Sequence, residues 1–166
     1  MKNKILIIII IISQLFFVNK SFSQEIDIQA KDIEFSNDQN LTIANDATAI
    51  IKQDGITIKG EKIKYYKDQS FLLINKGKIS SVTENFEIES EIIEYEIEKS
   101  NLNLKKNVKI NDDLNNLVMK SSEVNYDLER RKITSQSSSE IMDEFDNIYR
   151  VNGFEYSIKD KIIKLD

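Results

Sequence analysis

The sequence contains no cysteine, histidine, tryptophan or proline among its 166 residues, and only four glycines. Without cysteine or histidine it has no thiolate nucleophile, no disulfide, no imidazole general base and no conventional zinc or copper site. We therefore predict a protein that is not an enzyme, and we assign no catalytic residue, no metal ligand and no cofactor. The lack of disulfides is compatible with export, because an oxidising compartment permits disulfides without requiring them.

The N-terminal segment has the order of a secretory signal peptide. Two lysines precede an apolar run over residues 5–12, and small residues at Ser21 and Ser23 come just before Gln24. This order predicts cleavage before Gln24 and export to the periplasm, where association with the outer membrane stays open. An uncleaved anchor is the alternative, but polar residues interrupt the roughly 20 apolar residues that a membrane span needs.

Removal of the signal peptide, residues 1–23, leaves an acidic domain over residues 24–166. Cleavage removes three of the 23 basic residues and none of the 28 acidic ones, which gives a formal charge of −8. A chain of this charge without a basic cluster repels phosphate backbones, so nucleic acid is not an expected partner. The length is that of a single domain.

A short signature of one apolar, one polar and one aromatic residue recurs five times. Its aromatic members are 30, 30, 31 and 30 positions apart. They are Phe35, Tyr65, Tyr95, Tyr126 and Tyr156. A near-constant spacing of this size indicates a stacked repeat architecture. Within each repeat apolar and polar residues alternate with a period of two, and a second alternating segment follows a polar turn, which predicts strands rather than helices.

A small residue occupies the same place in every repeat. These residues are Ala30, Gly60, Ser90, Ser121 and Gly153. A bend between two strand segments, where crowding excludes a large side chain, would require this pattern. The segment Thr134 to Ser139 breaks the alternation and predicts a loop, and Glu140 to Asp146 predicts a helical turn.

The fold class predicted from these patterns is all-β, with antiparallel sheets that fold over one another and are built from about five 30-residue repeats. The inward positions of the strands form a continuous apolar row, which is the candidate lipid-binding groove. Its residues are Ile28, Ile33, Phe35, Ile58, Ile63, Tyr65, Ile74, Ile88, Ile93, Tyr95, Leu104, Met119, Val124 and Tyr126. The same pattern is expected of an ordinary filled core, so the sequence leaves open whether the interior is a lumen or a core.

These repeats resemble a known family. A strand with a small residue, the signature Ile-Glu-Phe or Ile-Glu-Tyr, a polar turn and a strand ending in Lys-Lys-Asn-Val-Lys-Ile (105–110) are together similar to the OstA-like domain. That domain occurs in the lipopolysaccharide-transport proteins LptA and LptC and in the N-terminal part of LptD. The resemblance covers residues 25–133 and, less closely, the last repeat. It implies a twisted, open β-jellyroll whose apolar groove holds the acyl chains of lipid A while the sugars stay in water.

On this resemblance the expected function is that of a periplasmic bridge protein, LptA-like, that carries lipopolysaccharide from the inner to the outer membrane. The implied partners are lipopolysaccharide and the related jellyroll domains of inner- and outer-membrane transport proteins. A head-to-tail homo-oligomer is a further expectation, because an open sheet has two edges that can add strands. The segments Ile26 to Ala30 and Ile162 to Leu165 are the candidate edges.

Three alternatives stay open: an N-terminal LptD domain or fragment without its barrel, a structural β-solenoid without a ligand, and a small exported hydrolase. The acidic cluster between Glu87 and Glu98 could form a paired-carboxylate or calcium site. A solvated strand face is the favoured interpretation, because alternating Ile and Glu is what a half-exposed strand requires.

Overall fold

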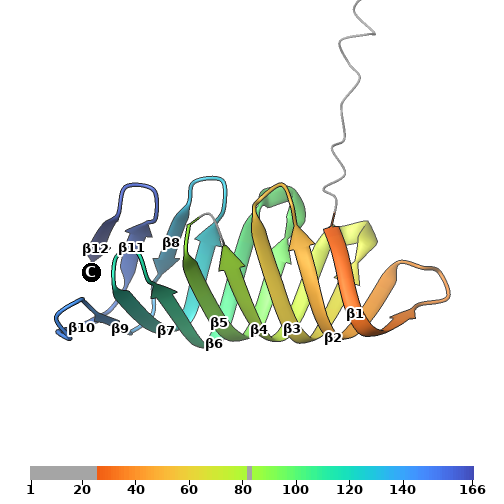
Figure 1. Cartoon of the computed structure of the whole chain (residues 1–166), viewed down its shortest axis with the longest axis horizontal. Helices are drawn as coiled ribbons and strands as arrows, with labels where there is room; N and C mark the ends of the chain where they lie inside the picture. Colours follow the sequence, from red (N-terminus) through yellow and green to blue (C-terminus); the bar gives the residue numbers. More distant parts are fainter. Residues whose placement is uncertain (1–25, 82–83) are drawn as a thin grey trace, which may run out of the picture.

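The computed structural model describes residues 26–81 and 84–166, which form one antiparallel sheet (Figure 1). The strands are β1 (Ile26–Phe35), β2 (Leu41–Ile51), β3 (Ile56–Tyr66), β4 (Phe71–Ser81), β5 (Phe86–Glu96), β6 (Asn101–Asp112), β7 (Leu117–Asp127), β8 (Lys132–Ser135), β9 (Ser139–Met142), β10 (Ile148–Val151), β11 (Phe154–Ser157) and β12 (Ile162–Leu165). Two short 3-10 helices, η1 (Lys67–Gln69) and η2 (Ile97–Lys99), connect β3 to β4 and β5 to β6. The strand order follows the sequence from β1 to β8 and continues to β11 and β12, while β9 pairs with β7 and β10 pairs with β9. This is the all-β, folded-over architecture that the repeats predicted.

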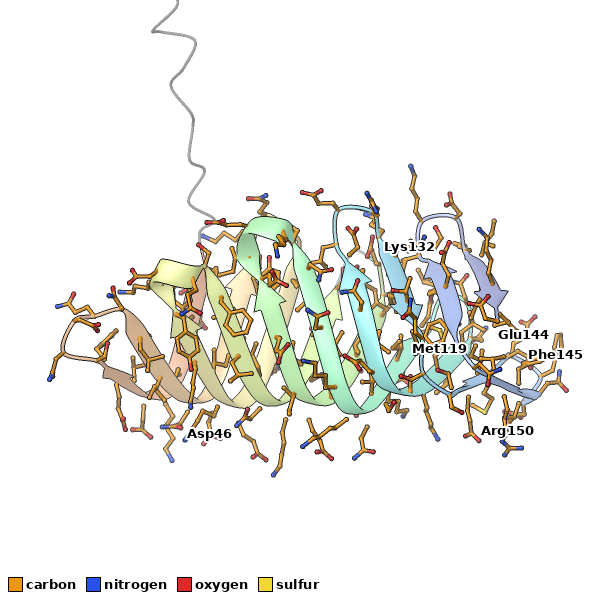
Figure 2. All side chains as sticks on the ribbon, turned by 180° about the vertical axis from the view of Figure 1, so that it is seen from behind. Asp46, Met119, Lys132, Glu144, Phe145 and Arg150 are labelled. Carbon is orange, nitrogen blue, oxygen red and sulfur yellow. The ribbon has the colours of Figure 1, made fainter. Side chains whose placement is uncertain are left out.

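Each long strand bends near its middle, and the bends align along the lower side of Figure 1. Between β1 and β2, Ala30 pairs with Ala47 and Asp32 pairs with Asn45, so one residue of each strand is skipped. The skipped residue Asp46 has a left-handed φ of 47° and lies on the outside of the bend (Figure 2). One residue of each strand is skipped in the same way in the pairs β2–β3, β3–β4 and β4–β5. In the pairs β5–β6 and β6–β7 the register shifts at this place. A bulge at this place increases the local bend and twist of the sheet.

The small residue of each repeat lies at this bend, as its periodic placement predicted. A Cβ atom on Gly60 would lie only 2.4 Å from the Cγ2 atom of Ile74, and a Cβ atom on Gly77 would be similarly crowded. At the register shift between β5 and β6, the Ser90 hydroxyl donates a hydrogen bond of 2.8 Å to the carbonyl oxygen of Lys105. The bend therefore needs small side chains, and a hydroxyl there can also satisfy a backbone carbonyl.

The bend divides the sheet into two layers, which we call layer A and layer B. Layer A consists of residues 26–30, 47–51, 56–60, 77–81, 86–90, 108–112, 117–121, 139–142 and 148–151. Layer B consists of residues 32–35, 41–45, 62–66, 71–75, 92–96, 101–105, 123–127, 132–135, 154–157 and 162–165. The layers pack face to face: the ring of Phe86 in layer A meets the ring of Tyr126 in layer B edge-on, with centroids 5.5 Å apart.

Alternate residues of both layers point between the layers and form the core. In layer A, Ile58, Ile79 and Ile88 pair across three strands and have no exposed surface. Met119, labelled in Figure 2, is equally buried. Because both layers contribute an apolar inner face, burial of these side chains is the main force that holds the folded-over sheet closed.

The predicted loop over Thr134 to Ser139 is shorter than expected. Thr134 and Ser135 belong to β8 and Ser139 begins β9, which leaves only residues 136–138 between the strands. The alternation of apolar and polar residues fails here because Ser135 and Ser139 lie where the chain passes from one layer to the other. Both serines are buried, and the Ser139 hydroxyl donates to the carbonyl oxygen of Ser137 at 2.7 Å.

The helical turn predicted over Glu140 to Asp146 is wrong. Residues 140–142 lie in β9, and residues 143–147 form the turn of the β9–β10 hairpin. The Asp143 carboxylate accepts hydrogen bonds from the backbone N–H groups of Phe145 and Asn147, at 2.9 and 3.0 Å. An aspartate that accepts from the backbone two to four residues later stabilises a tight turn, and the strand pairing on either side excludes a helix.

Candidate functional site

The structure brings the predicted groove residues onto the inner faces of the two layers. Ten of them have at most 1% of their surface exposed: Ile58, Ile63, Ile74, Ile88, Ile93, Tyr95, Leu104, Met119, Val124 and Tyr126. Ile28 and Tyr65 are partly buried and pack against this core. Ile33 and Phe35 are 42% and 64% exposed, because they lie on the first strand of the sheet, at the end of layer B.

The inner positions line up from strand to strand without interruption. In layer B one row begins at Ile33, runs through Ala44, Ile63, Ile74, Ile93 and Leu104, and reaches Val124. At a strand spacing of about 4.8 Å, a row of seven residues extends for about 29 Å. The structure therefore contains an apolar track that crosses β1 to β7 perpendicular to the strands, and the register of β7 with β8 places the buried Ser135 beside its last residue.

The sequence-based selection of groove residues left out several residues of the inner face. The second strand of each repeat contributes Leu72, Ile79, Leu102 and Ile110, all at most 1% exposed. The signal was present, because these residues alternate with polar ones as the selected residues do. The selection took only Ile74 and Leu104 from the second strands, because the aromatic signature marks the first strand of each repeat.

The inner side chains fill the space between the layers. Tyr95, Tyr126 and the inward-facing isoleucines on β3 to β5 have essentially no exposed surface, so the interior is a packed core in this structure. An acyl chain can lie on the inner face only where the two layers separate. Of the two interpretations that the sequence left open, this burial supports the filled core.

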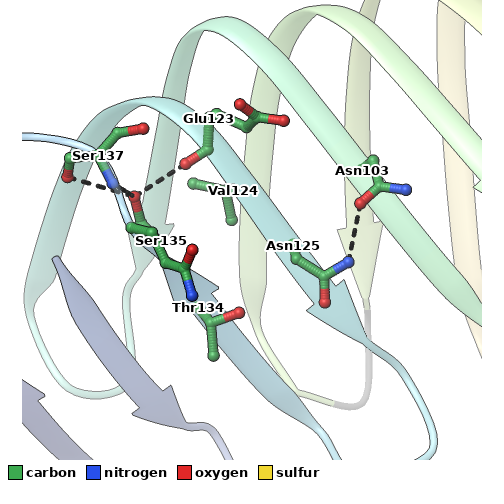
Figure 3. Close-up of a pocket in the computed structure, with 8 residues that line it drawn as sticks. Asn103, Glu123, Val124, Asn125, Thr134, Ser135 and Ser137 are labelled. Atoms are coloured by element: carbon green, nitrogen blue, oxygen red, sulfur yellow. Dashed lines mark hydrogen bonds between the residues drawn. The ribbon is translucent and has the colours of Figure 1, made fainter.

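Two surface cavities lie near the bend, outside the core. One of about 360 Å³ lies between β6, β7 and the β8–β9 connection and is lined mainly by polar groups (Figure 3). There Ser135 donates to the carbonyl oxygen of Glu123 at 2.9 Å, and Asn125 donates to Asn103 at 2.9 Å. A second cavity of about 690 Å³ is lined by lysines, serines and Val108 on the outside of the bend. Neither lining offers the continuous apolar surface that an acyl chain requires.

The glutamates of β5 from the acidic cluster are partly or fully exposed on the outside of the sheet. Lys78 pairs with Glu87 at 2.6 Å and with Glu89 at 3.6 Å, and Lys105 pairs with Glu94 at 2.9 Å. The hydrogen bond that Lys78 donates to Glu87 raises the pKa of Lys78, which therefore stays charged. Within the described residues no group of three or more carboxylates could hold a metal ion. The cluster is a solvated face with cross-strand ion pairs, as favoured from the sequence.

Opposite the bend, the turns of layer A meet the turns of layer B along a line that we call the seam. Three tyrosines of layer B reach across it to carboxylates of layer A, and we call each such contact a clasp. Tyr95 donates to Asp54, whose other oxygen accepts from the Ser100 hydroxyl at 3.3 Å. Tyr126 donates to Glu84 at 3.3 Å, and Arg131 pairs with the same carboxylate at 2.9 Å.

The third clasp is the most buried. Tyr156 donates to Asp112, which is only 2% exposed and also accepts two hydrogen bonds from Asn115, at 3.0 and 2.8 Å. Each tyrosine reaches a carboxylate that is 41 to 44 residues earlier in the chain. Layer B is therefore offset against layer A by about two strands.

The clasp tyrosines are held in their neutral, donating form. Burial raises the pKa of the Tyr95 hydroxyl, and its hydrogen bond to Asp54 raises it further. Burial likewise raises the pKa of Tyr126 and Tyr156, with added contributions from the charge of Glu84 and from the hydrogen bond to Asp112. A hydrogen bond to a charged group contributes about 1.5–3 kcal/mol, so the three clasps make a sizeable contribution to closure of the seam.

The offset between the layers leaves inward apolar residues uncovered at both ends of the sheet. At the β1 end these are Ile33 and Phe35. At the other end they are Tyr149 of β10 and Leu165 of β12, which are 44% and 43% exposed and pair with the buried residues Ile141 and Phe154. The strands β1 and β12 end the sheet, as predicted, and β10 forms a further edge in layer A.

Comparisons with known proteins found a family model and solved structures that match this chain. The family model described as "LptC: Lipopolysaccharide-assembly, LptC-related" matches residues 5–166. Among solved structures, one match is the crystal structure of LptH, the LptA homologous periplasmic component of the lipopolysaccharide transport device from Pseudomonas aeruginosa. The two chains are 11% identical, the match covers 86% of this chain and 82% of that one, and the TM-score is 0.34. The search of curated protein sequences found no match. Across residues 26–81 and 84–166 the structure has no helix with the length and apolar character to cross a membrane.

Proposed function

Because this chain belongs to the family of LptC-related lipopolysaccharide-assembly proteins, we propose that it binds lipopolysaccharide in the periplasm and carries its acyl chains along the inner face of the folded sheet. The observation that carries this proposal is the unbroken apolar row across layer B from Ile33 to Val124, which is exposed where it begins.

The energetics favour a continuous apolar track. An acyl chain of about 12 to 14 carbons costs on the order of 10 kcal/mol to expose to water, at about 0.8 kcal/mol per methylene group. On a row of similar side chains spaced by one strand, each position offers nearly the same burial, so the chain can slide with small changes in free energy. The track itself supplies no direction, which must come from an energy-consuming partner.

The two ends of the sheet support a bridging role. The strands β1 and β12 each have one edge without a strand partner in the described structure, and β10 has another. Backbone groups on such edges can pair with a strand of a second molecule. We propose that the edge at β12 and β10 joins the β1 edge of a related jellyroll domain or of a second copy of this chain. The partner would cover Phe35 and extend the apolar row into the next domain.

Site-specific photo-crosslinking tests the binding proposal. A photoreactive amino acid at Ile58, Ile88 or Ile93 is expected to form adducts with added lipopolysaccharide. The matched controls are the outward neighbours Lys59 and Glu89, which lie on the same strands but face water. Equal adduct formation at inward and outward positions, or none at all, would show that the acyl chains do not occupy the inner face.

A further inference from the structure

We propose that lipopolysaccharide enters and leaves the interior sideways through the seam, and that the three clasps are latches that open in turn as the lipid moves along the fold. This inference rests on the proposed function. It adds the route by which the lipid reaches the inner face and the side chains that control that route.

A lipid head group can project from the fold only on a long side where no backbone joins the two layers. In the described structure the seam is that side. A lipid whose chains lie inside and whose sugars lie in water must cross the boundary of the fold at every position along its path. At the bend every long strand passes from one layer to the other, so covalent backbone blocks the way. The chain also passes between the layers at the bend after β8 and after β10, through residues 136–138 and 152–153. Within the described residues, the backbone hydrogen bonds of the turns do not join layer A to layer B across the seam.

On the layer B side of the seam, backbone hydrogen bonds join the turns into one continuous row, which we call the rail. Each of its turns donates a backbone hydrogen bond to the turn before it: Lys67 to Asn40, Ile97 to Ser70, Leu128 to Ser100 and Ile158 to Arg131, at 2.9 to 3.0 Å. The turns of layer A make no such bonds to one another in the described structure. The layer A turns are therefore expected to move away from the rail when the seam opens, with the bend as the hinge.

The clasps are polar contacts that cross the seam, and they recur at regular intervals. Tyr95, Tyr126 and Tyr156 lie two strands apart in layer B, a step of about 10 Å. A lipid head group that moves along the seam meets one clasp after another. Because each clasp joins a tyrosine on the rail to a carboxylate on the movable side, a single clasp can open while the next still holds the layers together.

The absence of native cysteine makes the route directly testable with engineered disulfides. The paired substitutions Asp54→Cys and Ser100→Cys replace side chains that touch across the seam, at 3.3 Å between Oδ1 and Oγ. The matched control, Glu61→Cys with Lys76→Cys, replaces an ion pair of 3.1 Å between neighbouring strands at the bend. Both proteins carry a photoreactive residue at Ile88, and adduct formation with lipopolysaccharide is followed in time, oxidised and reduced.

Oxidation of the seam pair is expected to slow adduct formation at least tenfold, and reduction is expected to restore it. Oxidation of the bend pair is expected to change the rate less than twofold. Equal rates for the oxidised and reduced seam pair would overturn the inference and would indicate that the lipid enters from an end of the sheet. If neither reduced protein forms adducts, the proposed binding function fails, and the inference fails with it.

Removal of one latch provides the opposite perturbation. Tyr126→Phe keeps the ring but removes the hydroxyl that donates to Glu84, and it is expected to speed uptake and release about tenfold, the factor that one such hydrogen bond is worth. The control is Tyr66→Phe, at the last residue of β3, which lies outside the predicted groove and whose ring contacts Phe71 with centroids 6.0 Å apart. Unchanged rates in Tyr126→Phe, or equal acceleration in both variants, would refute the role of the clasp.

Discussion

The three buried tyrosines predict a loss of stability at alkaline pH. Their folded pKa values are raised by burial and by adjacent carboxylates, whereas in the unfolded chain each hydroxyl titrates near pH 10. Above pH 10 the unfolded chain releases these protons and the folded protein keeps them, so rising pH favours unfolding. Below pH 10 both forms are neutral, and the stabilising contribution is fully present.

The size of this stability loss depends only on the pKa of tyrosine in the unfolded chain, provided that the pKa values in the folded protein lie above the pH of the measurement. At pH 11 an unfolded tyrosine is about 90% ionised, and this costs the folded state about 1.4 kcal/mol per residue relative to pH 9. The three tyrosines together give a loss of about 4 kcal/mol, a large part of the 5–15 kcal/mol that stabilises a typical domain. Urea unfolding at pH 9, 10 and 11 measures this loss.

A single substitution separates the contribution of the tyrosines to this pH dependence from that of other titratable groups. Hydrogen bonds to glutamates raise the pKa of Lys78, Lys99 and Lys105, which adds a pH dependence of the same sign. The variant Tyr126→Phe keeps these lysines, so its loss of stability between pH 9 and pH 11 should be smaller than that of the parent by about 1.4 kcal/mol. An equal loss in both proteins, or full tyrosinate absorbance in the folded parent at pH 11, would refute the assignment of a raised pKa.

Three further predictions concern the termini, the edges and the bend. Mass spectrometry of the exported protein should show a first residue at or near Gln24; an intact Met1 end in the inner membrane would instead indicate an anchored component. Ile163→Pro should weaken head-to-tail association, measured by sedimentation with the family partners, and leave the β circular dichroism unchanged; identical monomers in variant and parent would contradict edge pairing. Gly60→Val should destabilise the fold by about 1–3 kcal/mol, because its Cβ would overlap Ile74. The outward change Lys59→Val should cost less than about 0.5 kcal/mol, and equal costs would show that the bend tolerates larger side chains.

The sequence determined the features that depend on local spacing. A period of two fixes which side chains of a strand share a face, so the inner position of residues such as Ile58 and Ile93 followed from alternation alone. The repeated small residue predicted the bend, and at Gly60 the structure shows the crowding directly, because a Cβ atom there would lie 2.4 Å from Ile74. The period of about 30 residues and the aromatic signature were sufficient for the fold class.

Tertiary structure decided the features that depend on how the layers face each other. The offset of about two strands leaves Phe35 exposed although its pattern matches that of buried Tyr95, and no local signal distinguishes the two. The same offset brings Tyr156 to Asp112, residues that no local spacing links. Only the tertiary structure shows that the two layers close into a packed core. Alternation specifies which face of a strand turns inward, but the twist of the whole sheet sets which strands of one layer meet which strands of the other.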